Sequence, residues 1–352
     1  MVDLEPMKRI LITGVNGLIG RSCVEKFLGS DASILGIDND ARATFFGEDA
    51  STSFARTLGG EDAQSFTIKK LDITNRLEIE KLLSDFRPDL VIHTAAQPSH
   101  DKAAQIPYLD FETNAVGTLN LLESLRKFNL DGVFVHLSTN KVYGDSPNLL
   151  PIKELDSRFD FNDAHFGIGI GEYHAIDSSL HSLFGVSKLS ADVLVQEYGR
   201  YFGMKTCVLR AGCLTGANHK GVELHGFLSW LVKCNLSESN YSIFGYKGKQ
   251  VRDNLHAKDV AEFIYQFTLN PGFASIYNLG GGYENSISVI EAIDLVTQIS
   301  GIKMKTTYID SPRKGDHIVY YSDLSKIKRD FPDWKVSMNL HEIVSDLVGN
   351  EN

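Results

Sequence analysis

The sequence predicts an α/β protein, with a Rossmann-type, doubly wound parallel sheet followed by a smaller C-terminal α/β domain. Two observations predict this fold. Short apolar stretches alternate with helical patterns of apolar residues along the first part of the chain, as in a parallel sheet with helices on both faces. The first apolar stretch also runs directly into the glycine turn Gly14-Val-Asn-Gly17-Leu-Ile-Gly20, and a helical pattern follows this turn.

The composition limits the possible partners. The chain has 352 residues, which is enough for one large α/β domain and a smaller one. Its 35 Lys and Arg residues against 45 Asp and Glu residues give a net charge of −10, and no basic cluster points to nucleic acid as a partner. The acidic N-terminus does not resemble a signal peptide, and no apolar run is long enough to span a membrane.

The cysteines indicate the compartment. Cys23, Cys207, Cys213 and Cys234 are few and scattered, without the paired spacing of a metal site. Such thiols are typical of a reducing environment. We therefore expect a cytoplasmic protein with no metal ion.

The first strand–turn–helix–strand unit predicts the cofactor. Residues 8–13 and 33–37 are the expected strands, and the second strand ends at Asp38. Glycines let the backbone approach a pyrophosphate, and the start of the helix offers free N–H groups and a positive dipole end. Asp38 lies 18 residues beyond Gly20, where a carboxylate suits the ribose hydroxyls of NAD and repels the 2′-phosphate of NADP. The sequence therefore predicts NAD.

The rest of the first half continues the alternation, apart from the polar and irregular residues 41–64. We expect strands at residues 66–71, 89–93 and 131–136, and helices at residues 75–86 and 108–128. The small residues Ala95 and Ala96 would let the strand end at residue 93 approach a cofactor closely. Tight packing explains these small residues equally well.

Residues 151–183 are an insertion rich in Phe, Tyr, His and Asp. Its run Gly167-Ile-Gly-Ile-Gly171 follows no strand, so we expect a flexible or irregular loop that covers or contacts the substrate. The later expected elements are a helix at residues 184–202, strands at residues 205–210, 241–244, 250–256 and 276–279, and helices at residues 227–234, 258–268 and 340–348. Trp334 and the last helix are expected to cover the smaller domain.

These patterns divide the chain into two expected domains. Residues 1–215, with about residues 256–282, would form the NAD-binding Rossmann domain. Residues 216–255 and 283–352 would form the substrate-binding domain. No internal repeat or low-complexity segment interrupts either part.

Two segments carry candidate catalytic residues. Thr139 follows the strand at residues 131–136, at the sheet edge where ligands bind, although a Thr there often only caps a turn. Phe184 and Lys188 are four residues apart, so on a helix they share one face. An amphipathic helix that merely carries a Lys would look the same, so this pair alone does not decide the function.

These segments resemble the extended short-chain dehydrogenase/reductases, and within them the NAD-dependent nucleotide-sugar epimerases and dehydratases. The family pattern Tyr-x-x-x-Lys stands here as Phe184-Gly-Val-Ser-Lys188. The run Ser138-Thr-Asn-Lys-Val-Tyr-Gly-Asp145 is similar to the CDP-paratose 2-epimerase branch. It lacks the acid–base carboxylates that the 4,6-dehydratases carry after the Thr, which argues against elimination chemistry.

The resemblance implies a bound NAD and a CDP- or UDP-linked sugar as substrate. Thr139 would hydrogen-bond the reacting sugar oxygen, and Lys188 would bind the cofactor ribose and relay protons. The implied substrate contacts are Thr139, Asn140, Lys141 and the diphosphate-binding Arg252 and Arg313. The implied cofactor contacts are Gly14, Asn16, Gly17, Leu18, Ile19, Gly20, Asp38, Asn39, Asp72, Ile73, Ala95, Ala96, Gln97, Asn114 and Lys188.

Phe184 departs from the family pattern, because its ring has no proton to exchange. In the family the phenolate takes a proton from a sugar hydroxyl as hydride leaves the same carbon. An active protein therefore needs a substitute base. We expect His181 first and Lys141 second, with Tyr173 or His174 on the insertion as further candidates.

Three functions stay open. The preferred one is an epimerase like CDP-paratose 2-epimerase, which oxidises a sugar transiently to a ketosugar and reduces it again on the opposite face. The alternatives are another redox enzyme on such substrates, a 4-epimerase or a reductase, and a non-catalytic protein that binds NAD and a nucleotide sugar. Family members pair through helices equivalent to residues 108–128 and 184–202, so a homodimer is expected.

Overall fold

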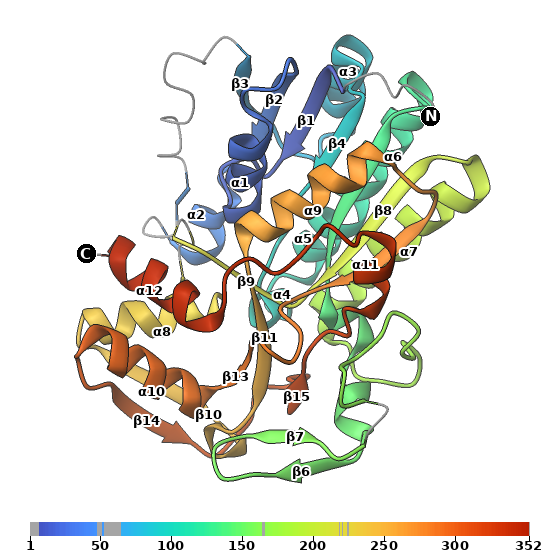
Figure 1. Ribbon diagram of the computed structural model, residues 1–352. Helices are drawn as coiled ribbons and strands as arrows, with labels where there is room; N and C mark the ends of the chain where they lie inside the picture. The colour runs from blue at the N-terminus through green and yellow to red at the C-terminus, as the bar shows by residue number, and fades with distance from the viewer. Residues whose placement is uncertain are drawn as a thin grey trace.

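The computed structural model describes residues 7–47, 51–52, 65–163, 166–217, 219, 221–223 and 225–351. Its centre is a seven-stranded parallel sheet in the order β3-β2-β1-β4-β5-β8-β12 (Figure 1). The strands are β1 (Arg9–Thr13), β2 (Ser33–Asp38), β3 (Phe66–Lys70), β4 (Leu90–His93), β5 (Val133–Thr139), β8 (Lys205–Ala211) and β12 (Ser275–Leu279). The Rossmann-type fold predicted from the sequence is confirmed.

Helices cover both faces of the sheet because its strands are apolar on both sides. The helix α1 (Leu18–Phe27) packs beside α9 (Ala257–Leu269) on one face. The other face is covered by α3 (Arg76–Phe86), α6 (Gly117–Phe128) and α7 (Ser182–Phe202). Two short helices, α2 (Ala41–Phe46) and α4 (His100–Ala103), follow the ends of β2 and β4.

The helix expected at residues 108–128 forms in three parts. It runs as α5 (Pro107–Phe111), a π-helical turn at Glu112–Val116, and α6. The π turn carries Asn114, whose side chain accepts a hydrogen bond from the backbone N–H of Gln97 at 2.9 Å. Such single π turns often occur next to functional sites.

The smaller domain is built from chain segments after β8. Its core packs α8 (Phe227–Leu236), α10 (Val289–Ser300) and α12 (Leu340–Glu351) with the parallel strands β10 (Asn240–Phe244) and β14 (Lys305–Ile309). A second sheet centres on β11 (Val251–His256), which pairs with β9 (Cys213–Thr215), β13 (Ser286–Ser288) and β15 (Val319–Tyr320).

Two features differ from the expected domain division. The strand β9, placed before the boundary at residue 215, pairs with β11 and therefore belongs to the smaller sheet. Trp334, expected to cover the smaller domain, instead packs on the large one after α11 (Ser325–Asp330). It is 2% exposed, stacks edge-on against Phe263 and donates a hydrogen bond to the Asp259 backbone oxygen at 2.9 Å.

The glycine run Gly167–Gly171 of the insertion is irregular, as expected, but it packs against its neighbours. The insertion also contains the hairpin β6 (Ile152–Glu154) and β7 (Phe159–Phe161). Ile170 is buried and bridges to Ser322, so the glycine run is held against the segment after β15. A Cβ at Gly169 would lie 2.6 Å from the backbone nitrogen of Asp323, which explains why a glycine is needed there.

A buried ion pair joins α7 to the sheet. Asp192 on α7 accepts two hydrogen bonds of 3.0 Å from the Arg210 guanidinium on β8. The hydroxyl of Ser138 on β5 donates to the same carboxylate at 2.7 Å. This network fixes α7 against the strand ends that carry Thr139.

None of the helices in the described part of the chain has both the length and the apolar composition needed to cross a bilayer. No group of three or more His, Cys, Asp or Glu side chains in those residues is arranged to hold a metal ion.

Candidate active site

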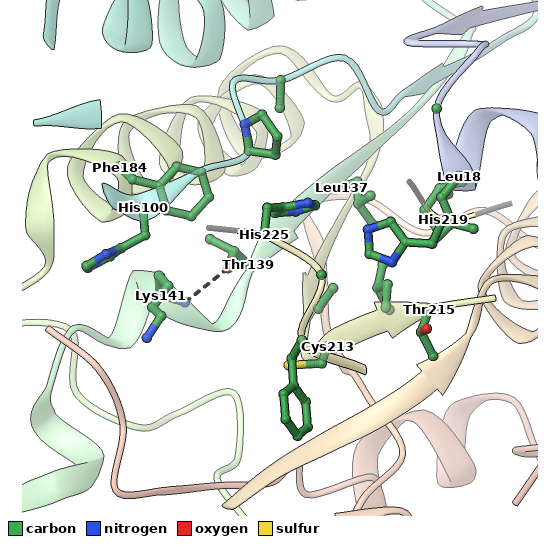
Figure 2. A pocket seen from close by; sticks show the side chains of 18 of the residues that line it. Leu18, His100, Leu137, Thr139, Lys141, Phe184, Cys213, Thr215, His219 and His225 are labelled. Atoms are coloured by element: carbon green, nitrogen blue, oxygen red, sulfur yellow. Dashed lines mark hydrogen bonds between the residues drawn. The ribbon is translucent and has the colours of Figure 1, made fainter. Parts of the chain in front are cut away.

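The main pocket lies at the carboxyl ends of the parallel strands, between the sheet and the smaller domain. Residues of β2 and β5, together with residues just after β1 and β4, line one side, and residues of β10 and β11 line the other. Figure 2 shows side chains of both domains facing this space. This is where an open parallel sheet binds its ligands.

The glycine turn after β1 forms the floor of the pocket. Gly14 has a φ of +66°, and a Cβ there would lie 2.7 Å from the backbone nitrogen of Ala95. The helix α1 begins at Leu18, and no side chain caps it at Gly17. Its first N–H groups are therefore available to an anion. This close, donor-rich turn fits the pyrophosphate of a dinucleotide.

Asp38 lies at the end of β2 and lines the same end of the pocket. Its carboxylate accepts hydrogen bonds from the backbone N–H groups of Asn16 at 3.0 Å and Asp40 at 2.8 Å. Burial raises the pKa of Asp38. Asn39 and Arg42 also line this end. The position suits hydrogen bonds to the hydroxyls of a ribose.

The expected cofactor contacts fall into two groups. Lining the pocket are Gly14, Gly17, Leu18, Ile19, Asp38, Asn39, Ile73, Ala95, Ala96 and Lys188. Away from its lining are Asn16, Gly20, Asp72, Gln97 and Asn114. Direct contact of this second group with the cofactor stays a prediction, and in the structure these residues lie next to those that line the pocket.

The hydrogen bonds and close packing of these residues show how they support the pocket. A Cβ at Gly20 would lie 2.4 Å from the backbone oxygen of Gly14, so glycine lets α1 approach the turn. Asp72 accepts a hydrogen bond from the Asn39 amide at 2.8 Å. Gln97 and Asn114 are buried and hydrogen-bond each other, which holds the strand end at Ala95 in place.

Thr139, Phe184 and Lys188 come together on one wall of the pocket. Thr139 ends β5, and its hydroxyl oxygen accepts a hydrogen bond from the Lys141 N–H at 3.2 Å. Phe184 and Lys188 lie one turn apart on α7 and are 7% and 4% exposed. The Lys188 ammonium donates to the Leu137 backbone oxygen at 2.7 Å, and burial lowers the pKa of Lys188 to about 8.

His181 does not face the pocket, so the expectation that it acts as the base is wrong. Its Nε2 lies 2.7 Å from the backbone oxygen of Ile176, and its Nδ1 lies 3.5 Å from that of Lys141. The chain turns sharply between His181 and the helix, where Ser182 has a φ of +63°. The helical spacing assumed for His181 therefore does not hold.

The insertion also supplies no described residue of the pocket lining. Tyr173 is 96% exposed, and the His174 ring packs edge-on against Tyr143 and Phe166. Neither side chain reaches the pocket in this structure, and a lid role for the insertion stays a prediction. The buried packing of Ile170 and Phe161 holds the insertion against β15.

Charged side chains surround Asp316 at the pocket. This carboxylate pairs with Arg252 at 2.6 Å and with Lys141 at 3.3 Å. Although burial favours the neutral acid, the charges of Arg252, Lys141 and Arg313 hold the pKa of Asp316 well below its ordinary value. Arg252 and Arg313 line the pocket, as does Asn140. An incoming diphosphate would compete with Asp316 for the Arg252 guanidinium.

The sequence matches a known family over most of its length. The family described as "NAD dependent epimerase/dehydratase family" matches residues 10–280. The chain belongs to this family. Its members' NAD dependence agrees with the glycine turn and Asp38, and NAD is the cofactor. One solved relative in fold, UDP-glucose 4-epimerase from Thermus thermophilus, was crystallised with NAD, at 24% identity and a TM-score of 0.75.

Curated relatives cover nearly the whole chain. CDP-paratose 2-epimerase of Salmonella typhi is 29% identical over 346 residues, covering 96% of this chain and 98% of that protein. UDP-glucuronate 4-epimerase of Thermodesulfobacterium geofontis is 28% identical over 334 residues, covering 94% and 92%. UDP-glucose 4-epimerase of Thermotoga maritima, solved with UDP-glucose, shares the fold with a TM-score of 0.77 at 24% identity, covering 97% and 98%.

Several pocket residues of this epimerase/dehydratase were missed from the sequence. His100 follows β4 and lines the pocket beside Phe184 (Figure 2). Its place just after a strand end was the signal that could have found it. Asp316 pairs with residues far away in the chain, so no local pattern points to it.

His219 and His225 also line the pocket, although lone histidines of this kind are more often packing or surface residues. Their rings lie edge-on with centroids 5.4 Å apart. Burial lowers the pKa of His219 to about 3 and that of His225 well below its ordinary value. Both rings are therefore neutral at physiological pH.

Proposed function

We propose that the protein is an NAD-dependent epimerase of a nucleotide-diphosphate sugar, acting like CDP-paratose 2-epimerase. The observation that carries the proposal is the meeting of Thr139 and Lys188 with the glycine turn and the Arg252 guanidinium in one pocket. Bound NAD supplies a reversible hydride acceptor. A sugar placed between these groups could be oxidised and then reduced on its other face.

The chain's own residues would bind and orient the reacting groups. The Thr139 hydroxyl would hydrogen-bond the reacting sugar oxygen. The Lys188 ammonium would bind the cofactor ribose and, with a pKa of about 8, exchange protons near neutral pH. Arg252 and Arg313 would bind the diphosphate, because each can donate two parallel hydrogen bonds.

Phe184 supports a second candidate, a non-catalytic protein that binds NAD and a nucleotide sugar. Its buried ring lines the pocket where the family has a phenol. Against this candidate stand Thr139 and Lys188, because binding alone needs no hydroxyl at the reacting carbon. The similarity to UDP-glucuronate 4-epimerase keeps inversion at another carbon as an alternative reaction.

One experiment separates these functions. NAD-loaded protein is incubated with CDP-paratose, UDP-glucuronate and UDP-glucose, and the products are followed by NMR and by absorbance at 340 nm. We expect an isomer of one sugar without net NADH. Net NADH would favour a dehydrogenase or reductase. Saturable binding of a sugar nucleotide without formation of any isomer would contradict the epimerase function. It would favour the non-catalytic protein that binds NAD and a nucleotide sugar.

The cofactor preference gives the first prediction. Asp38→Ala should lower the ratio of the NADP to the NAD dissociation constant at least tenfold. The carboxylate that repels a 2′-phosphate is removed, while the cationic Arg42 still lines this end of the pocket. Fluorescence titration with NAD and NADP measures the two dissociation constants. Equal affinity of the wild-type protein for both cofactors would contradict the prediction.

We also infer a homodimer in the cytoplasm. Exposed apolar side chains lie on the adjoining helices α5, α6 and α7, among them Tyr108 at 85% exposure, Leu119 and Val186. Such a face needs a partner surface, and a second copy offers a matching one. All four cysteines are unpaired, which supports a reducing compartment.

Light scattering at micromolar concentration tests this assembly. We expect twice the chain mass of 39.0 kDa for the wild-type protein. Val186→Glu should shift it to the monomer, because the exposed Val186 lies on the proposed contact. Leu77→Glu is the matched control, since Leu77 is exposed on α3, and it should leave the mass unchanged. A monomeric wild-type protein would refute the dimer.

A further inference from the structure

His100 occupies the wall of the pocket where the family's phenol is missing. It is the first residue of α4 and lines the pocket together with Phe184 and Lys141. Figure 2 shows its imidazole next to the Phe184 ring and near Lys141. His219 also lines the pocket but lies beside Leu18, and the His225 ring lies nearer the middle of the view, above Thr139 (Figure 2).

A chain of charged groups orients the His100 ring. Its Nδ1 lies 3.2 Å from a carboxylate oxygen of Asp101, and the other oxygen accepts a hydrogen bond from Arg313. Although burial favours the neutral acid, these two partners hold the pKa of Asp101 below its ordinary value. Asp101 therefore stays a carboxylate and favours the tautomer with a proton on Nδ1, as in other Asp–His pairs.

This tautomer leaves a lone pair on Nε2. Nε2 is buried and has no hydrogen-bond partner among the described residues. Buried ring nitrogens are normally paired, so an unpaired one needs an explanation. A Cβ at Gly315 would lie only 3.1 Å from Nε2, so a larger residue there would crowd the nitrogen. A substrate hydroxyl is the partner that the pocket would supply.

We propose that His100 replaces the phenol as the group that takes the proton from the sugar hydroxyl and later returns it. This role rests on the proposed epimerase function. The O–H proton moves to Nε2, and the O–H electron pair forms the second bond of the ketone. The hydrogen of the same carbon leaves with its electron pair to NAD. Return of the hydride to the opposite face of the carbon, and of the proton from Nε2 to the oxygen, would restore the alcohol and the neutral imidazole.

Asp101 is a positioning residue in this scheme, because it acts through the His100 ring. Arg313 would couple diphosphate binding to the imidazole. A diphosphate that draws Arg313 away from Asp101 would change the hydrogen bonding of the His100 ring. Phe184 fills the space of the missing phenol and shields the reacting atoms from water.

The test compares four proteins with the sugar that the wild-type protein turns over, chosen from CDP-paratose, UDP-glucuronate and UDP-glucose. His100→Ala should lower kcat by 10²–10⁴-fold, as loss of a general base does, with little change in NAD affinity. The double variant His100→Ala with Phe184→Tyr should have a kcat at least tenfold higher than His100→Ala alone, because the double variant carries a phenol beside Lys188. Phe184→Tyr alone should change kcat less than tenfold.

A matched control is His181→Gln, since His181 faces the Ile176 backbone oxygen outside the pocket. It should keep kcat within threefold. A His100→Ala protein with wild-type kcat overturns the proposal and leaves the epimerase function standing. A loss of activity that neither Phe184→Tyr nor added imidazole restores also overturns it, since the role would then be structural. A wild-type protein inert on all three sugars overturns the epimerase function and this role together.

Discussion

Lys188→Met is expected to lower kcat by 10²–10⁴-fold in the isomerisation assay, the range that loss of a proton-transferring group covers. Methionine keeps most of the buried volume of a side chain that is only 4% exposed. The variant removes the ammonium that donates to the Leu137 backbone oxygen and faces the pocket. NAD should also bind more weakly, because a hydrogen-bond donor to the ribose is lost.

The control for this variant is Lys258→Met, because Lys258 is an exposed lysine on α9 outside the pocket lining. Its kcat should stay within threefold of the wild-type value. A Lys188→Met protein with the kcat of the wild type would refute a role of this lysine in the chemistry. If the protein only binds NAD and a nucleotide sugar, Lys188→Met should bind NAD more weakly, and neither the wild type nor the variant should show activity.

Lys188 also predicts a pH dependence of stability. Burial lowers its pKa from 10.5 to about 8, so between these pH values the unfolded chain binds a proton that the folded protein has released. The free energy of unfolding therefore contains a contribution that rises with pH across this window. Below pH 8 Lys188 is protonated in both the folded and the unfolded protein, so the free-energy cost of burying its charge no longer changes with pH.

Urea unfolding of the wild-type protein and of Lys188→Met at pH 7 and pH 10 isolates this contribution, because the other titrating groups cancel in the comparison. The wild-type protein should gain stability relative to the variant as the pH rises. Parallel pH profiles for the two proteins would mean that Lys188 keeps an ordinary pKa in the folded state.

Asp192→Ala is expected to destabilise the fold by about 3–5 kcal/mol, the usual effect of leaving one half of a buried ion pair without its partner. Asp192 accepts hydrogen bonds from Arg210 and Ser138, and both charged side chains are almost fully buried. Removal of the carboxylate leaves the Arg210 charge in the core between α7 and β8.

Urea unfolding measures this loss. Arg200→Ala is the matched control, since its pair with Glu197 on the same helix is exposed, and the change should stay below about 1 kcal/mol. The double variant Asp192→Leu with Arg210→Met should recover part of the loss, because it removes both buried charges. A change of less than about 1 kcal/mol for Asp192→Ala would refute a structural role for this pair.

The sheet and its cofactor turn follow from local signals. The central parallel strands are short apolar runs, and the turn from Gly14 to Gly20 combines a strand, closely spaced glycines and a helix start within one stretch of chain. Asp38 sits at the end of the next strand by the same local logic. These elements were predictable because their pattern and their position depend on neighbouring residues.

The candidate site was only partly predictable. Thr139 and Lys188 carry motifs and line the pocket, whereas His181 carries a helical spacing that the turn at Ser182 breaks. The direction of a side chain just before a helix depends on backbone angles that the residue pattern does not specify. His100 was missed because its place after a strand end was the only signal in the sequence, and its partners Asp101 and Arg313 meet only in the folded protein.

The sequence by itself determined the order of strands and helices, the NAD-binding turn and the loss of the phenol at position 184. Only the tertiary structure decided which charged groups meet. Asp101 lies 212 residues from Arg313, and Lys141 lies 175 residues from Asp316, yet both pairs are in contact beside the pocket. Such contacts arise when the two domains pack, because burial in a shared cavity brings together side chains that have no relation along the chain.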